Sequence, residues 1–138
     1  MRRVALICGL VGVLFQAGCS GPKLEGKWIA SDTARETITF SGNKFTLEGS
    51  LPDGTTLTIG GTYTYDKDKL NLRSQSVTMK ARRPAEQKMI DKNLAANQRR
   101  LLAAFDSKNP RQVTWWKNDE VQFKTSDGKD TMYDRVKS

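Results

Sequence analysis

The chain has 138 residues, of which 37% are hydrophobic and 28% are charged, so it is too polar for a multispanning membrane protein and too apolar for a disordered one. It carries a formal net charge of +8, has no His and contains only two Cys. Without His, a general base that uses imidazole and a zinc site that mixes His and Cys ligands are both excluded.

The first residues have the three parts of an export signal. Two arginines precede an apolar run over residues 4–15, and small residues then lead to Cys19. The run is shorter than the ~20 apolar residues that a spanning helix needs, which favours a cleaved signal over a permanent anchor. We expect residues 1–18 to be removed and residues 19–24 to form a short tether before one domain over residues 25–138.

The sequence around Cys19 resembles the bacterial lipobox. Ala17 and Gly18 match the small residues before the cysteine of that motif, while Gln16 stands where an apolar residue is usual. The resemblance implies that Cys19 carries acyl chains such as palmitate and anchors the protein to a membrane. Ser20 stands where inner-membrane retention signals place Asp, which implies an outer-membrane anchor with the domain facing the periplasm. The alternative is an ordinary cleaved signal that leaves a free thiol.

Apolar and polar residues alternate from Gly26 onward, which predicts β-strands. The alternating segments are 28–30, 38–40, 45–47, 57–65, 70–79, 113–115, 121–123 and 132–136. Turn-forming residues separate most of them, and Gly60-Gly61 predicts a bend or bulge within one strand. Sequential hairpins favour a mainly β fold, an antiparallel up-and-down barrel of about eight strands, because closure removes exposed strand edges.

Residues 84–106 break the alternation and predict one amphipathic helix, inserted before the last three strands. Pro84 suits a first helical turn, and Asn109-Pro110 ends the helix. The helix is predicted to place apolar side chains on one face and cations on the opposite face. The apolar face consists of Ile90, Leu94, Leu101 and Phe105, and the basic face contains Lys88, Lys92 and Arg99.

The excess positive charge of the domain lies in the same insert. Residues 80–111 carry nine basic and three acidic side chains, whereas the segments 20–79 and 112–138 are each balanced. The helix either covers the barrel with its cations solvated, or presents them to anionic phospholipid or to a protein partner. Nucleic acid is not an expected partner, because an exported chain rarely meets it and no aromatic residues interleave with the cations.

No pattern in the chain indicates catalysis or a metal site. The pairs of carboxylates fall in predicted turns, where Asp is favoured for backbone reasons alone. They offer fewer ligands than a calcium loop needs. No Ser lies in a nucleophile elbow, and no Gly-rich loop precedes a helix. We therefore expect a protein that is not an enzyme and that has no cofactor.

The first and last strands resemble those of lipocalins and the wider calycin group. Gly26-Lys27-Trp28 matches the GxW signature of that group, and Arg135 matches its late-strand arginine. The resemblance implies that Trp28 closes the barrel floor with Arg135 packed on its ring. The strings ITFSGNKFT, GTYTYDKDKLNL and YDRV extend the match to small bacterial lipocalin-like lipoproteins. The departures are a short body and a helix that interrupts the strand series.

These observations lead to two hypotheses of function. In the first, an exported, lipid-anchored, lipocalin-like barrel binds a small apolar or amphiphilic ligand. The residues expected to line that ligand are Trp28, Phe40, Phe45, Tyr63, Leu72, Trp115 and Phe123. In the second, a cell-envelope module with a filled barrel uses its basic helix to engage an anionic membrane or a protein partner.

Overall fold

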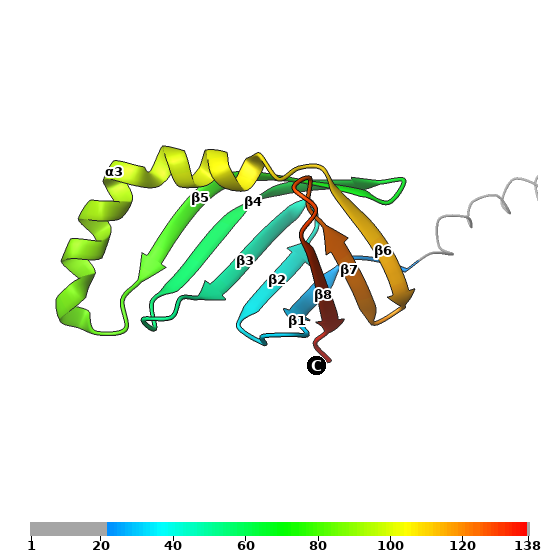
Figure 1. The fold of residues 1–138 in the computed structure, drawn as a ribbon, viewed down its shortest axis with the longest axis horizontal. Coiled ribbons are helices and arrows are strands. Elements are labelled where there is room, and N and C mark those ends of the chain that lie inside the picture. Colours follow the sequence, from blue (N-terminus) through cyan, green and yellow to red (C-terminus); the bar gives the residue numbers. More distant parts are fainter. Residues whose placement is uncertain (1–21, 138) are drawn as a thin grey trace, which may run out of the picture.

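The computed structural model describes residues 22–137, which form one closed antiparallel barrel and one long helix (Figure 1). Each strand pairs with the next along the chain, and β8 pairs with β1 to close the barrel. The elements are β1 (Gly26–Ala30), β2 (Glu36–Ser41), β3 (Lys44–Ser50), β4 (Thr56–Asp66), β5 (Lys69–Lys80), the 3-10 turn η1 (Pro84–Glu86), α3 (Gln87–Asp106), β6 (Arg111–Lys117), β7 (Glu120–Lys124) and β8 (Asp130–Arg135). The predicted eight-stranded antiparallel barrel, with one helix before the last three strands, is confirmed.

The hairpin of β2 and β3 shows how the alternation places side chains. Phe40 lies opposite Phe45 and Ile38 lies opposite Leu47, so that the apolar residues of both strands share the inner face. All four are buried. The turn between the strands uses Gly42 at φ +63°, a backbone conformation that favours glycine.

The predicted irregularity at Gly60-Gly61 is present as a register shift between β4 and β5. A Cβ on Gly61 would lie 2.0 Å from the carbonyl oxygen of Arg73, so only glycine fits this close approach. A bulge increases local twist and bends the strand. These two long strands curl as the barrel requires.

The barrel closes unevenly between β5 and β6. These strands share only two residue pairs, the last of which joins Leu70 to Arg111, so most of β5 has no strand neighbour on that side. The loop after α3 supplies the next bonds. The Asn109 side chain accepts a hydrogen bond from the backbone N–H of Leu72 (2.9 Å) and donates one to its carbonyl. An amide side chain thus takes the place of a strand partner.

Helix α3 also bonds to the edge of β5 that has no strand partner. Asp106 accepts hydrogen bonds from the backbone N–H (2.9 Å) and the hydroxyl (2.8 Å) of Ser74. At the other end of the helix, Gln87 accepts one from the N–H of Ala81 (2.7 Å) and donates one to the carbonyl of Met79 (2.9 Å). The helix therefore satisfies backbone groups of the free strand edge as well as covering it.

The apolar face of α3 matches the predicted one only in part, because Ile90 is half-buried and is not among the residues packed against the core. Leu94, Leu102 and Phe105 pack against the buried core, whereas Leu101 is 37% exposed. The helix bends as it passes along the barrel (Figure 1), so its inner side does not follow the spacing of a straight helix. The prediction that Leu101 faces the barrel is therefore wrong.

A candidate ligand cavity at the barrel mouth

Most of the aromatic residues predicted to line a ligand pack against one another. The rings of Trp28 and Trp115 meet edge to face at 5.8 Å between centroids, and those of Phe40 and Tyr63 do so at 4.8 Å. Trp28 and Phe40 are at most 1% exposed. We call this half of the barrel the closed end. Its interior is a packed core, as close packing of large side chains requires.

The other predicted lining residues divide between the core and the opposite end. Phe45 and Leu72 are each 2% exposed and belong to the same core cluster. Tyr63 also borders a separate surface hollow beside residues 22–25. Phe123 is the one member of the predicted set that lines the cavity described below.

Trp28 and Arg135, the pair predicted for the barrel floor, lie together at the closed end. The guanidinium carbon of Arg135 is 4.2 Å from the centroid of the Trp28 ring. Its N–H groups donate to the carbonyls of Lys23 (2.8 Å) and Glu25 (2.7 Å), and Asp119 lies 3.2 Å away. This arginine therefore holds residues 23–25 across the floor of the barrel, and its hydrogen bonds and ion pair are all made to protein groups.

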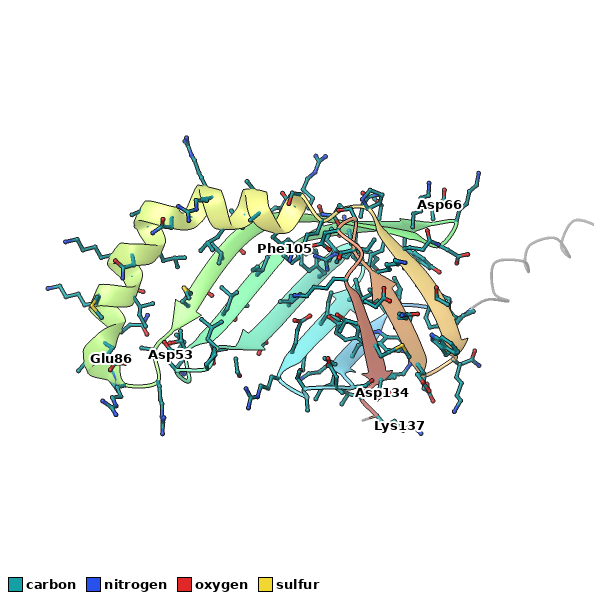
Figure 2. The ribbon with its side chains drawn as sticks, in the orientation of Figure 1. Asp53, Asp66, Glu86, Phe105, Asp134 and Lys137 are labelled. Carbon is teal, nitrogen blue, oxygen red and sulfur yellow. The ribbon has the colours of Figure 1, made fainter. Side chains whose placement is uncertain are left out.

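A cavity of about 370 Å³ occupies the opposite end, which we call the mouth. Phe105 reaches it from the C-terminal part of α3 (Figure 2), and the helix therefore forms part of its wall. Most of its apolar lining comes from β3, β4 and β7. The apolar side chains that line the cavity include Leu47, Leu57, Ile59, Phe105 and Phe123.

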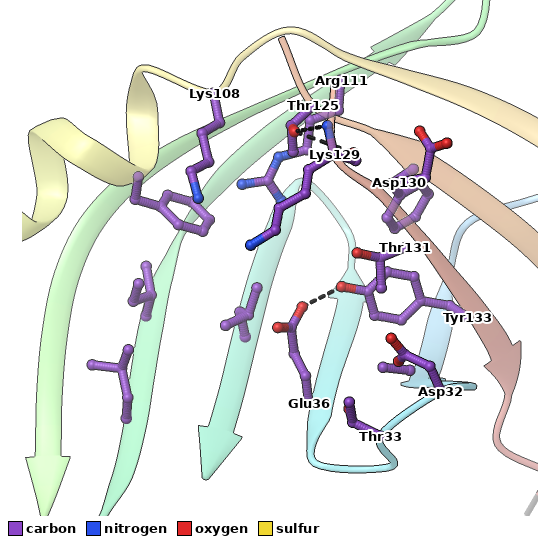
Figure 3. A pocket seen from close by; sticks show the side chains of 16 residues that line it. Asp32, Thr33, Glu36, Lys108, Arg111, Thr125, Lys129, Asp130, Thr131 and Tyr133 are labelled. Atoms are coloured by element: carbon purple, nitrogen blue, oxygen red, sulfur yellow. Dashed lines mark hydrogen bonds between the residues drawn. The ribbon is translucent and has the colours of Figure 1, made fainter. Parts of the chain in front are cut away.

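Charged side chains enter the mouth from two sides (Figure 3). Lys108 and Arg111 come from the end of the helical insert and the start of β6, and Lys129 comes from the turn between β7 and β8. Asp32 comes from the segment that joins β1 to β2, and Glu36 is the first residue of β2. A third carboxylate, Asp130 at the start of β8, lies on the same side as Lys129, whereas Asp32 and Glu36 lie across the cavity from the three cations.

Arg111 is the most unusual of these residues. Its side chain faces inward on β6, only 6% of the residue is exposed, and its guanidinium carbon lies 4.6 Å from the centroid of the Phe105 ring. The Nε–H has no hydrogen-bond partner among residues 22–137, and none of the ion pairs in that range includes Arg111. Burial lowers the pKa of Arg111, yet a guanidinium stays protonated in proteins. Nearby carboxylates, Glu36 among them, act against this lowering, but the mouth still holds a buried positive charge without a direct ion pair among residues 22–137.

Tyr133 and Glu36 form the facing side of the mouth. The Tyr133 hydroxyl donates a hydrogen bond to the Glu36 carboxylate, and Tyr133 is only 3% exposed. Burial, followed by the neighbouring Glu36, raises the pKa of Tyr133 well above its usual range. The hydroxyl is therefore a fixed donor that holds the carboxylate in place.

Sequence reasoning did not single out Arg111, Glu36 or Tyr133. The signal that could have found Arg111 is strand parity. Alternation over residues 113–115 predicts that Val113 and Trp115 share one face of their strand, and Arg111 has the same parity. A charged residue at an inward position is costly unless it has a partner or a function. Glu36 shares the inward parity of Ile38 in the same way.

The basic face of α3 lies apart from this cavity. Lys88, Lys92 and Arg99 are all exposed, and none of them belongs to an ion pair within residues 22–137. Across that range, no helix combines the length and apolar character needed to cross a membrane. Cys19, the predicted lipidation site, lies outside the described residues.

No protein-family model matches the chain, and no curated protein is significantly similar to it. The side chains from Pro22 to Lys137 include no cluster of three His, Cys, Asp or Glu that could hold a metal ion. The chemistry of the mouth is therefore interpreted from its own residues.

Proposed function

We propose that this protein binds a small amphiphilic molecule in the mouth of its barrel, as a carrier or sensor and not as an enzyme. The observation that carries the proposal is the cavity of about 370 Å³, which has apolar side chains on one part of its wall and charged side chains on another. Small-molecule sites have volumes of roughly 300 to 1,000 Å³, with an apolar lining and a few placed polar groups. The mouth matches both criteria.

The packed closed end supports this assignment because it gives the mouth a rigid base. Phe45 stacks on Phe105 with centroids 5.9 Å apart and planes at 13°, which joins the core to the helix. Phe123, in turn, contacts both Phe40 and Tyr133. The ligand therefore occupies only the outer part of the barrel.

The binding test compares two leucine variants. The uncharged fluorescent probe N-phenyl-1-naphthylamine is titrated into the protein, and native mass spectrometry reports co-purified ligands. Leu57 lines the mouth, so Leu57→Asn should weaken probe binding severalfold. Leu51 is 37% exposed and does not line this cavity, so Leu51→Asn should have little effect. A protein that binds neither the probe nor any extracted ligand would overturn the proposal.

The cellular setting is proposed from the sequence. Export and acylation at Cys19 would make this a lipid-anchored, lipocalin-like protein of the outer membrane. Labelling cells with a clickable palmitate analogue tests this directly. The label should be lost in Cys19→Ala and kept in Cys8→Ala, because Cys8 lies within the predicted signal. Labelling that survives Cys19→Ala would contradict it.

A second candidate function rests on the unpaired cations of α3. The described chain starts at the closed end, whereas the N-terminal half of α3 lies at the opposite extreme of the molecule (Figure 1). The link from Cys19 to Pro22 spans at most about 11 Å. A membrane that holds the lipid anchor is therefore not the natural partner of this helix face, which favours an acidic protein or a second membrane surface.

Vesicle flotation and pull-down measure this second function. The triple variant Lys88→Gln, Lys92→Gln, Arg99→Gln should lose binding to anionic vesicles or to an acidic partner. A matched triple variant at Lys27, Lys69 and Lys124, which are exposed on the strands, keeps the same net charge. Equal loss in both variants would show only a general charge effect and would contradict a specific helix surface.

A further inference from the structure

We propose that the molecule bound in the mouth carries an anionic group, a carboxylate or a phosphate, and that Arg111 is its principal recognition residue. The inference rests on the proposed function, since it names the chemistry of the same ligand. Its starting point is the inward guanidinium of Arg111, which is 6% exposed and has an Nε–H without a partner among the described residues. Buried charges are normally paired, because loss of hydration costs several kcal/mol for each ion.

The carboxylates around Arg111 have other hydrogen bonds. Glu36 accepts from the hydroxyl of Tyr133, and Asp106 accepts from the backbone and hydroxyl of Ser74. Neither carboxylate comes within 4 Å of the guanidinium. The charge of Arg111 is therefore not neutralised by a direct ion pair.

The third nearby carboxylate is Asp127, in the turn between β7 and β8. It accepts hydrogen bonds from the Thr125 hydroxyl and from the backbone N–H of Lys129 (3.3 Å). Those bonds hold the turn in the conformation that brings the side chain of Lys129 over the mouth (Figure 3). The acidic residue thus orders a cation beside Arg111 without pairing with Arg111 itself.

The ring of Phe105 lies against the guanidinium of Arg111. The Arg111 guanidinium carbon lies 4.6 Å from the ring centroid, and Phe105 is itself held by its stacked contact with Phe45. A guanidinium that stacks through its face leaves its N–H edges for hydrogen bonds. Lys108 and Lys129 flank the same space (Figure 3), so an anion at this edge would meet three cations.

The apolar wall begins beside this cationic group. Leu57 and Ile59 of β4 line the same cavity as Arg111, which places an apolar surface within reach of a ligand bound through its charged end. A ligand with one anionic end and a hydrocarbon chain satisfies both parts of the wall. An uncharged lipid of the same length would leave the guanidinium desolvated and unpaired.

The test uses three probes with the purified protein: dodecanoate, dodecanol and acetate, each below any micelle concentration. A charge-assisted hydrogen bond to a buried guanidinium is worth about 1.5 to 3 kcal/mol, so dodecanoate should bind about 10- to 100-fold more tightly than dodecanol. Acetate should bind far more weakly than dodecanoate, because it gains nothing from the apolar wall. In Arg111→Gln, dodecanoate should fall to the affinity of dodecanol, while dodecanol binding persists.

The outcomes separate the two proposals. If neither twelve-carbon probe binds, the proposed function fails. If both bind equally well, or if Arg111→Gln retains the preference for dodecanoate, the anion proposal fails while the ligand site stands. If acetate binds as tightly as dodecanoate, the site takes a free anion and the amphiphile is excluded.

A measurement on the unmutated protein guards against a variant that misfolds. The ¹H–¹⁵N resonance of the Arg111 Nε–H reports directly on whether this donor gains an acceptor. We expect it to shift on addition of dodecanoate and to stay near its free position with dodecanol. If dodecanoate binds and this resonance does not shift, the proposed role of Arg111 would be overturned.

Discussion

The two ends of the barrel each contain an arginine that stacks on an aromatic ring, and the two arginines differ in what surrounds their N–H groups. At the closed end, Arg135 lies over Trp28 and its donors reach backbone carbonyls and Asp119. At the mouth, Arg111 lies over Phe105 and leaves its Nε–H without a partner among residues 22–137. The first arrangement stabilises the fold, and the second is the site at which we propose that a ligand supplies the missing partner.

The largest effect should come from the packed core of the closed end. Trp28→Ala removes a fully buried indole and should lower the free energy of unfolding by about 3 to 5 kcal/mol. Trp116 is 62% exposed, so Trp116→Ala should change it by less than about 0.5 kcal/mol. Urea denaturation measures both. Similar losses in the two variants would contradict the assignment of the closed end as the core.

Replacing each of the two arginines by Gln should affect the free energy of unfolding differently. Arg135→Gln removes hydrogen bonds and a stacking contact, and should lower the free energy of unfolding by about 1.5 to 3 kcal/mol. Arg111→Gln removes an unpaired buried charge, so stability should stay equal or rise. Thermal and urea unfolding distinguish them. A large loss of stability in Arg111→Gln would mean that this residue is structural.

Removing a side chain that bonds to the free edge of β5 should cause a smaller loss of stability. Asn109→Ala leaves the N–H and carbonyl of Leu72 without their side-chain partner, which should lower the free energy of unfolding by about 1 to 3 kcal/mol. Among residues 22–137, the side chain of Asn97 bonds only to the carbonyl of Asn93 within the helix, and Asn97→Ala should be neutral or slightly stabilising. Hydrogen exchange at the Leu72 amide would show whether the edge has opened.

The smallest effect should be the pH dependence from Tyr133. Burial raises the pKa of this tyrosine in the folded protein, whereas an unfolded tyrosine ionises near pH 10. The folded state therefore keeps a proton that the unfolded state has lost, and ionisation favours unfolding. Its contribution should be fully present below about pH 10 and should be lost as the pH rises further.

Tyr133→Phe isolates this contribution. The variant should show a shallower loss of stability between about pH 10 and pH 11.5 than the unmutated protein, as measured by urea denaturation at each pH. The absorbance of the tyrosinate near 295 nm should show one fewer late-ionising group. Identical slopes for the two proteins would contradict the buried position of the hydroxyl.

The barrel could be predicted from the sequence because its strands alternate strictly and its turns are short. Ile38, Phe40, Phe45 and Leu47 show the pattern that a curved sheet with one buried face imposes. The helix was also visible from its composition. Its exact inner face was not, because the bend in α3 depends on tertiary contacts that exchange Leu101 for Leu102.

The mouth was harder to predict because it depends on which interior residues leave space. The alternation shows that Trp28 and Phe123 face inward, but it does not show that the large rings fill one end and leave the other open. The inward position of Arg111 could be predicted from the alternation along its strand. Its lack of a partner could not, because it depends on the hydrogen bonds of carboxylates that are distant in the sequence.

The most direct test is a crystal structure of the protein with 12-bromododecanoate, located by the anomalous signal of bromine. We expect the carboxylate within hydrogen-bond distance of the Arg111 Nε–H, with the bromine against the apolar wall near Leu57. Bromine among the aromatic rings of the closed end, or a carboxylate far from Arg111, would contradict it.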